Sequence, residues 1–285
     1  MLPADRRAVD CWIGFPTSEP IQMLDPLRAQ FKDAESRSEG TSHVGFLFGA
    51  GIVHDEVDPV TTTLVAMDEH GIDVGLVQLI TQAAHRAVRE RPDRFRGLLH
   101  VDPNDTTAAV RAIRDAVVDP GICGVYLVPA GANPQVAVDD PLHYPIYQAC
   151  VDHHLAVVVN AGVVGPRVPS WSQDVMRFDQ VCFDFPDLRV VMCHGAEPDE
   201  ALAVKLMLKW PGLHFMTSGF APRHYPQAIL DYANSRGTEK VMYAGYYPYG
   251  LTLERIFGEL EQLPLRDHVW PAFLHENARR VFRLS

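Results

Sequence analysis

The sequence lacks the features of a membrane or secreted protein. No apolar run approaches the ~18 residues of a membrane-spanning helix, and the opening residues MLPADRRAVD lack the apolar core of a signal peptide. The five cysteines are scattered and never spaced Cys-x-x-Cys, which argues against a disulfide framework and a zinc ribbon. We therefore expect a soluble, cytoplasmic protein with reduced thiols and no membrane partner.

The chain also lacks an excess of basic residues. Its formal net charge is −11, so it would gain nothing from counterion release on DNA, and we expect no nucleic-acid partner. Hydrophobic residues make up 47% of the chain and charged residues 21%, which is a globular composition. The length of 285 residues suits one barrel-type domain that spans residues 1–285.

Several catalytic and cofactor motifs are missing. No Gly-x-Gly-x-x-Gly follows a predicted strand, no phosphate loop is present, and no Gly-x-Ser-x-Gly forms a nucleophile elbow. The 13 histidines include no His-x-His and no His-x-x-x-His pair. Because His153 and His154 are adjacent, on a helix they would point about 100° apart and could not chelate together. We expect no cofactor.

What the chain does contain is a regular alternation of short apolar runs with amphipathic runs. Helical periodicity is clear in places, for example in the buried-face spacing of Ala109, Ile113 and Ala116. Ser170 and Gln173 stand at capping-box spacing before another amphipathic run. Eight strands are predicted, at residues 8–15, 74–80, 97–103, 123–129, 155–162, 189–195, 213–219 and 240–248, with helices between them and two more near 252–263 and 267–282.

Eight strands alternating with helices predict either a closed parallel barrel or a doubly wound sheet. Because the glycine-rich motifs of doubly wound sheets are missing, we expect the barrel, which is an α/β fold of the (β/α)8 TIM-barrel type. Residues 17–58 interrupt the alternation after the first strand and look irregular, with apolar pieces such as VGFLFGAGIV that need a packing partner. We expect this segment to be a lid over the mouth of the barrel.

In such a barrel the working side chains stand at the carboxyl ends of the strands. If His194 points into the barrel, alternation predicts that Met192 does too, whereas Cys193 points toward the helices and is no catalytic thiol. The candidate residues at the strand ends are Trp12, Gly14, His100, Asp102, Tyr126, Asn160, His194, Ser218 and Tyr246.

Six segments stand in an order and spacing that resembles a known family. They are GVYLVP, DDPLHYPIYQAC, FDFPDLRVVMCHGAEP, TSGFAPRHYP, EKVMYAGYYP and HENARRVFRL. On these segments the chain is similar to the amidohydrolase-related family, in its branch that resembles aminocarboxymuconate-semialdehyde decarboxylase. The resemblance covers roughly residues 60–285 well and the first strand in outline only.

The resemblance implies a metal site whose ligands this chain has replaced. The family's His-x-His falls on Trp12 and Gly14, its fifth-strand histidine on Asn160, and its eighth-strand aspartate on Tyr246. Only the sixth-strand histidine remains, as His194 in VVMCHG. A divalent ion needs several converging imidazole or carboxylate ligands, so we expect no metal. A relocated site that uses His43, His54, His85 or His100 is the alternative.

These residues predict an enzyme that transfers a proton without a metal. The resemblance implies an acid–base role for His194, whose ordinary pKa near ~6.5 would make the rate depend on pH around neutrality. The predicted substrate is a small, aromatic or unsaturated, oxygenated molecule, and the reaction is of lyase, dehydratase, isomerase or cyclase type. The expected substrate-binding residues are Trp12, His100, Tyr126, Asn160, Ser218 and Tyr246.

Other interpretations stay open at this point. The protein could hydrolyse an activated ester or lactone by general base catalysis alone. It could also be an inactive barrel that binds a small molecule or a partner, because a fold does not fix a function. His194 could be a buried histidine held by backbone carbonyls, and Asn160 and Tyr246 could serve only packing. A homodimer is possible.

Overall fold

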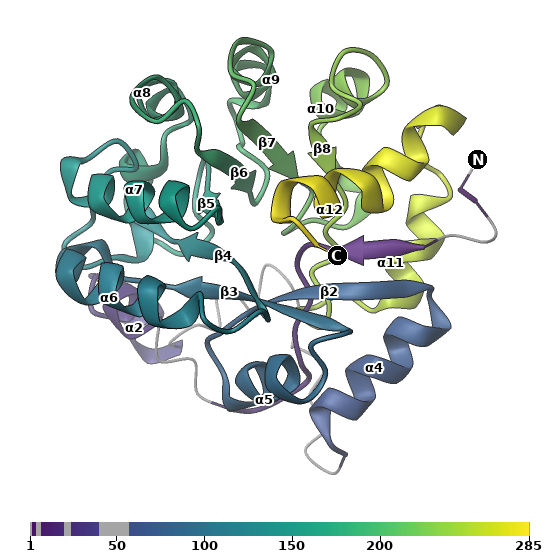
Figure 1. Ribbon diagram of the computed structural model, residues 1–285, viewed down its shortest axis with the longest axis horizontal. Coiled ribbons are helices and arrows are strands. Elements are labelled where there is room, and N and C mark those ends of the chain that lie inside the picture. Colours follow the sequence, from purple (N-terminus) through teal and green to yellow (C-terminus); the bar gives the residue numbers. More distant parts are fainter. Residues whose placement is uncertain (1, 4–6, 20–23, 40–56, 285) are drawn as a thin grey trace.

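A computed structural model, which describes residues 2–3, 7–19, 24–39 and 57–284, confirms the predicted barrel (Figure 1). Eight strands pair in parallel in chain order, from β1 to β8. They are β1 (Ala8–Asp10), β2 (Ile72–Gln78), β3 (Phe95–His100), β4 (Ile122–Leu127), β5 (Ala156–Asn160), β6 (Arg189–Cys193), β7 (Leu213–Met216) and β8 (Val241–Met242).

Helices form a ring outside the strands (Figure 1). They are α1 (Asp25–Arg28), α2 (Ala34–Glu39), α4 (Pro59–Glu69), α5 (Gln82–Glu90), α6 (Thr106–Ala116), α7 (Tyr144–Asp152), α8 (Phe178–Asp184), α9 (Glu200–Lys209), α10 (Gln227–Ala233), α11 (Leu253–Leu260) and α12 (Asn277–Phe282). Short 3-10 turns include η7 (Pro222–His224). Among the described residues, no helix is long and apolar enough to span a membrane.

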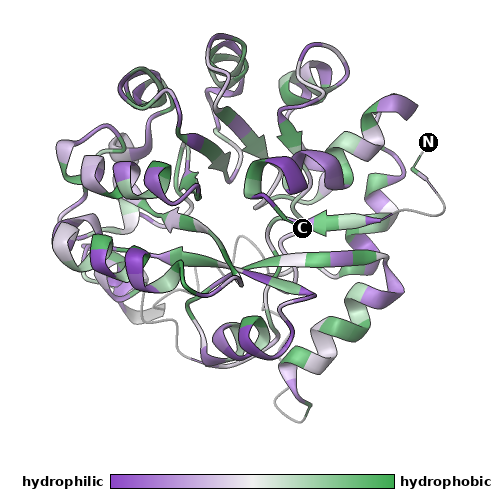
Figure 2. Cartoon of the chain, in the orientation of Figure 1, coloured by the Kyte–Doolittle hydropathy of each residue, from purple (hydrophilic) through white to green (hydrophobic). Residues whose placement is uncertain are grey.

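Apolar side chains pack in two layers on either side of the strands, which are coloured mainly as hydrophobic in Figure 2. The outer layer lies between the strands and the helices, and includes Phe95, Met192 and Phe215. The inner layer fills the barrel with smaller residues such as Val158 and Val191. Burial on both faces explains why the strands read as continuous apolar runs in the sequence.

The inner layer ends in a plug at the amino-terminal end of the barrel. Phe282 at the end of α12 is buried and packs in the same inner cluster as Val158 and Val191. A Cβ atom on Gly124 of β4 would lie 3.6 Å from the Phe282 ring and 2.9 Å from the Ala156 carbonyl oxygen. The helix α12 accordingly lies across the strands in Figure 1, and the opposite end of the barrel remains available for a site.

Asp10 joins the first strand to the last, where the barrel closes. The Cys11 N–H donates to the Tyr243 carbonyl at 3.1 Å, and the Tyr246 N–H donates to the Trp12 carbonyl at 2.9 Å. The Asp10 carboxyl accepts hydrogen bonds at one oxygen from the N–H groups of Trp12 at 3.0 Å and Gly245 at 2.8 Å. Asp10 is fully buried, and this burial raises its pKa to about 7.

Three predictions about local structure were wrong. The segment 17–58 is not wholly irregular, since α1 and α2 lie in its described part. Ser170 does not cap a helix, because its hydroxyl accepts from the Val164 N–H at 3.1 Å and α8 begins only at Phe178. The eighth strand is much shorter than expected, because the chain after Met242 turns into the mouth.

The described part of segment 17–58 is attached to the carboxyl-terminal end of the barrel. The Gln30 side-chain amide donates to the carbonyl oxygens of Ala130 at 3.1 Å and Ala132 at 2.9 Å. Arg167 forms ion pairs with Asp33 at 3.1 Å and Glu35 at 2.6 Å. Residues 40–56, which include the apolar piece VGFLFGAGIV, lie outside the described residues, so the lid remains a prediction.

The buried carboxyl at the barrel closure predicts an unusual pH dependence of stability. Because the pKa of Asp10 is raised in the folded state, its ionisation penalises folding increasingly as pH rises from about 4 to 7. Asp10→Asn keeps the oxygen that accepts both N–H groups and removes the ionisation. We expect the variant to gain about 2–3 kcal/mol more relative to wild type at pH 8 than at pH 5.

Urea unfolding of both proteins at the two pH values measures this difference. An equal effect of the substitution at both pH values would show that folding does not raise the pKa of Asp10.

Candidate functional site

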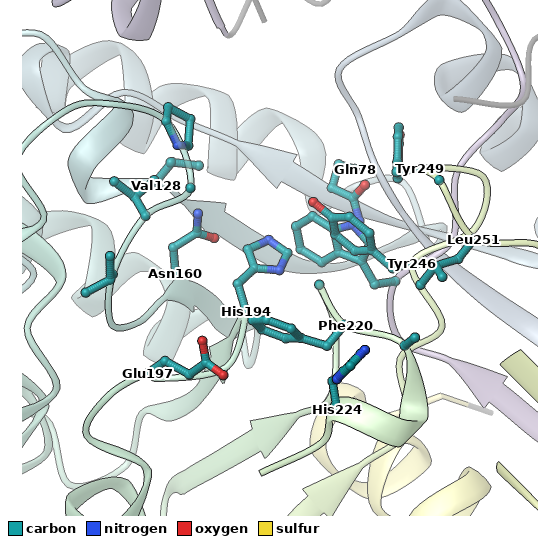
Figure 3. Close-up of a pocket in the computed structure, with 18 of the residues that line it drawn as sticks. Gln78, Val128, Asn160, His194, Glu197, Phe220, His224, Tyr246, Tyr249 and Leu251 are labelled. Atoms are coloured by element: carbon teal, nitrogen blue, oxygen red, sulfur yellow. The ribbon is translucent and has the colours of Figure 1, made fainter. Parts of the chain in front are cut away.

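A cavity of about 850 Å³ opens at the carboxyl-terminal ends of the strands (Figure 3). Its volume suits a small organic molecule. The predicted site residues Trp12, Tyr126, Asn160, His194 and Tyr246 all line it. Leu27 of α1 also lines it, which places part of segment 17–58 at the mouth.

His194 reaches the cavity because the chain turns sharply after β6. The backbone of His194, Gly195 and Ala196 has φ values of 63°, 95° and 59°. This left-handed conformation is costly for residues with a Cβ atom and is typical of functional sites. Tyr246, which follows β8, has φ 66°.

The same turn overturns the predicted orientation of β6. Met192 packs in the outer layer and Cys193 in the inner one, so side-chain alternation does not continue into His194. The Cys193 thiol lies 3.1 Å from the Asn160 side-chain oxygen, to which it donates. Burial raises the pKa of Cys193 and Cys11 well above the ordinary value, so both remain thiols, and a catalytic thiolate is not formed.

Ser218 holds the imidazole of His194 from behind. Its fully buried hydroxyl accepts from the His194 backbone N–H at 3.2 Å and lies 3.1 Å from Nδ1 of the ring. Burial lowers the pKa of His194 to about 4, against the opposing effect of a hydrogen bond to the Ser218 backbone. The expected titration near neutrality is therefore wrong for the free protein, in which the imidazole is neutral.

Aromatic rings surround His194 on the side where the family resemblance implied a metal. The Trp12 ring centroid lies 4.5 Å from that of His194 and 4.9 Å from that of Tyr126, both edge-to-face. Tyr246 stacks on Trp12 at 6.1 Å and meets His194 edge-to-face at 5.3 Å. Such contacts stabilise each pair of rings by about 0.5–1.5 kcal/mol beyond their burial.

These residues do not fit a divalent metal ion. A Cβ atom on Gly14 would lie 2.6 Å from the Tyr249 hydroxyl oxygen, so Tyr249 already occupies the space of a side chain at position 14. The Asn160 side-chain oxygen accepts from the Tyr126 hydroxyl at 3.0 Å and from Cys193. Among the described residues, no three His, Cys, Asp or Glu side chains gather to hold a metal.

The structure describes only two of the four histidines that a relocated metal site would use. His43 and His54 lie outside the described residues, and His85 is exposed on α5. His100 lines a separate cavity of about 80 Å³ beside Asp102, with its ring centroid 6.0 Å from that of Tyr126.

Several residues of the cavity wall were not predicted from the sequence. Gln78 ends β2, and the strand-end rule, applied to that strand as well, would have found it. Within the described part of the chain, Gln78 Nε2 and Trp12 Nε1 are buried donors without a hydrogen-bond partner. Glu197, Arg223 and Arg255 stand on loops and helices beyond the strand ends, where no strand-based rule locates them.

Known proteins are similar to this chain in sequence family and in fold. The family model described as Amidohydrolase matches residues 54–284, and no curated protein matches the sequence. An uncharacterised TIM-barrel protein from Bordetella bronchiseptica has a similar structure, with TM-score 0.74, 20% identity, and coverage of 98% of this chain and 99% of that one.

Two solved enzymes are similar at comparable levels. One is a 5-carboxyvanillate decarboxylase from Novosphingobium aromaticivorans with bound manganese and 3-methoxy-4-hydroxy-5-nitrobenzoic acid, with TM-score 0.69, 16% identity and coverage of 98% and 97%. The other is a probable 2-pyrone-4,6-dicarboxylic acid hydrolase from Acinetobacter baumannii with citric acid bound, with TM-score 0.70, 16% identity and coverage of 98% and 100%.

Likeness at these identities shows the fold, whereas the family match spans most of the sequence, from residue 54 to residue 284. The barrel, the cavity at its carboxyl-terminal end and the match together lead to one conclusion. This chain belongs to the amidohydrolase family of enzymes.

Proposed function

We propose that this protein is a metal-independent enzyme that moves a proton on a small aromatic or unsaturated oxygenated substrate, with His194 as the proton-transferring group. The observation that carries the proposal is the half-buried imidazole of His194, which is neutral and lies against the rings of Trp12 and Tyr246 in a site whose residues do not fit a metal. The proposal includes a cytoplasmic location, which the five free, buried cysteines support.

The low pKa of His194 favours a role as a base in the first step. When Nδ1 carries the ring hydrogen and donates toward Ser218, Nε2 keeps its lone pair for a substrate proton. The imidazolium so formed then returns the proton to another atom of the same substrate. Isomerisation, dehydration and cyclisation follow this order, whereas decarboxylation needs the imidazolium to protonate carbon.

The walls of the cavity support an aromatic or unsaturated substrate. Trp12, Tyr246 and Phe220 offer ring faces and edges for a flat molecule. Trp12 Nε1 and Gln78 Nε2 have no partner within the described part of the chain and are donors suited to a carbonyl or phenol oxygen. The two similar enzymes are named for carboxyvanillate and pyrone dicarboxylate, which are oxygenated compounds of this kind.

Hydrolysis of an activated lactone is the second candidate. It is favoured by the similarity to a probable 2-pyrone-4,6-dicarboxylic acid hydrolase, whose named substrate is a cyclic ester. A neutral His194 can deprotonate water as water attacks an activated carbonyl. Products distinguish the two reactions, because hydrolysis adds a water molecule to the substrate and isomerisation does not.

We expect purified protein to contain no stoichiometric zinc or manganese, because Trp12, Gly14, Asn160 and Tyr246 replace the ligands that the family resemblance implies. Elemental analysis of tag-free protein tests this, and treatment with a chelator should leave activity unchanged. About one metal ion per chain, lost together with activity on chelation, would contradict the proposal and point to ligands among His43, His54 and other residues.

We expect His194→Asn to lower the turnover number roughly 10²–10⁴-fold with little change in substrate affinity, because asparagine hydrogen-bonds but cannot shuttle a proton. Titration of His194 should not change the wild-type rate near neutral pH. The rate should fall as pH drops through about 4, where the imidazole becomes protonated. Steady-state kinetics across pH measures both effects.

His100→Asn is the matched control, since His100 lines the separate small cavity, and it should change turnover little. Full turnover in His194→Asn would remove the residue from the mechanism. If the wild-type protein binds a ligand but turns no substrate over, the remaining interpretation is an inactive barrel that only binds a small molecule.

A further inference from the structure

Two buried side chains on the cavity wall each carry a hydrogen-bond donor without a partner. Trp12 is 5% exposed and Gln78 is 3% exposed, and both line the cavity. Within the described part of the chain, neither Trp12 Nε1 nor Gln78 Nε2 has a hydrogen-bond partner. A buried donor without a partner destabilises a folded protein, so such groups are rare. Beside a cavity, a pair of them indicates a ligand that accepts both hydrogen bonds.

The fold places the two donors at neighbouring strand ends. The strands β1 and β2 pair in parallel, and beyond β1 the Ile13 N–H donates to the Leu76 carbonyl at 3.1 Å. Trp12 directly precedes Ile13, and Gln78 follows Leu76 by two residues, at the end of β2. Trp12 and Leu76 belong to the inner layer, and alternation along β2 directs Gln78 to the same side.

Both donors lie near the proposed base. The Trp12 ring centroid is 4.5 Å from that of His194, and Tyr246 stacks on the other ring of this pair, Trp12, at 6.1 Å. Figure 3 shows Gln78 and Tyr246 on the same side of His194. A substrate that gives a proton to His194 would therefore place its reacting atoms beside the two donors.

A third buried polar atom without a partner on this wall, within the described residues, is an acceptor. Gln173 is 2% exposed, and its Nε2 donates to the Gly162 carbonyl at 2.9 Å, whereas its side-chain oxygen has no partner. Such an oxygen can accept from a substrate hydroxyl but cannot stabilise negative charge. Trp12 and Gln78 are thus the buried donors that remain for a charged oxygen in the described part of the wall.

We infer that Trp12 Nε1 and Gln78 Nε2 form an oxyanion-binding pair, which stabilises the negative charge that collects on a substrate carbonyl or phenol oxygen when His194 removes a proton. In this step the proton passes to His194 Nε2, and the electron pair of the broken bond moves onto the oxygen. The charge leaves the oxygen again when the imidazolium protonates another atom of the substrate.

This inference deepens the proposed function, because it rests on a substrate that His194 deprotonates in this cavity. Donors that are already fixed and closed off from water stabilise a developing charge strongly, since they need not reorganise during the reaction. Two neutral side chains would thereby supply the charge stabilisation that a metal ion can supply as a Lewis acid.

Binding of 4-nitrophenol and 4-nitroanisole to the full-length protein tests the pair without turnover. The two compounds share the ring and the nitro group, but only the phenol ionises, and its phenolate has a distinct absorbance. At a pH above this ionisation, we expect wild type to bind the phenolate about tenfold more tightly than the anisole.

The titrations are made in about 1 M salt, where the Debye length is ~3 Å. This salt screens Arg223 and Arg255 at the mouth, whose side chains are 61% and 41% exposed, so that their attraction for an anion contributes little. The hydrogen bonds of the buried pair are not screened in this way.

Trp12→Phe and Gln78→Met should each lower phenolate affinity about tenfold, and the double variant should not prefer the phenolate. Affinity for the anisole should stay near the wild-type value, which shows that the cavity is intact. Trp171→Phe and Gln148→Met are matched controls, because they change exposed side chains that do not line the cavity, and both affinities should stay unchanged.

Thermal unfolding of the ligand-free protein separates this role from a structural one. Gln78→Met replaces an unpartnered amide with an apolar chain of similar length, so we expect its Tm to rise by roughly 2–4 °C while phenolate affinity falls. A residue that only supports the fold would lower the Tm when replaced. If Trp12→Phe does not fold, Gln78→Met decides the question by itself.

His194→Asn should keep the preference for phenolate, because the probe is already ionised and no proton has to move. The oxyanion-binding pair and the catalytic role of His194 can therefore fail separately. A preference that is lost in His194→Asn would assign recognition of the charge to His194 and contradict the inference.

The inference is also overturned by equal affinities of wild type for the two compounds, by a preference that survives in the double variant, or by failure of wild type to bind either compound at millimolar concentration. A lower Tm of Gln78→Met with unchanged phenolate affinity would assign Gln78 a structural role instead.

Discussion

The packing of Trp12 against His194 is the contact on which the character of this site depends. The two rings meet edge-to-face at 4.5 Å, with Tyr126 and Tyr246 against the same indole. A cluster of rings offers no charge to a nearby imidazole, and it covers part of the imidazole's surface. Burial in this cluster is the main reason that the pKa of His194 falls to about 4 and that the ring is neutral.

The rest of the barrel supports that cluster. Asp10 ties the backbone of Trp12 to that of Gly245, the residue before Tyr246, so two of the rings are fixed by one carboxyl group. The left-handed turn at His194 and the hydroxyl of Ser218 fix the third. At the other end α12 plugs the barrel with Phe282, which leaves a single end at which these side chains meet a cavity.

The sequence predicts much of this because repeating patterns determine it. Apolar runs and helical spacing locate all eight strands in order, and the strand-end rule finds Trp12, Tyr126, Asn160, His194 and Tyr246. Features set by a single backbone angle or by tertiary contact are not predictable in this way. The φ of 63° at His194 breaks the alternation of β6, so His194 reaches the cavity although Cys193 before it faces the inner layer. Tyr249 fills the space beside Gly14 from a distant segment. Arg223 and Arg255 come together only because η7 packs beside α11 around Glu259.

The central claim is that His194 is a neutral imidazole in a metal-free aromatic site. NMR titration of ¹⁵N-labelled imidazole measures its protonation directly, and His194→Asn assigns the signal. The account predicts a midpoint near pH 4 in the free protein, unchanged by a chelator. A midpoint near ~6.5, or a ring nitrogen shifted by a metal that the chelator removes, would contradict it.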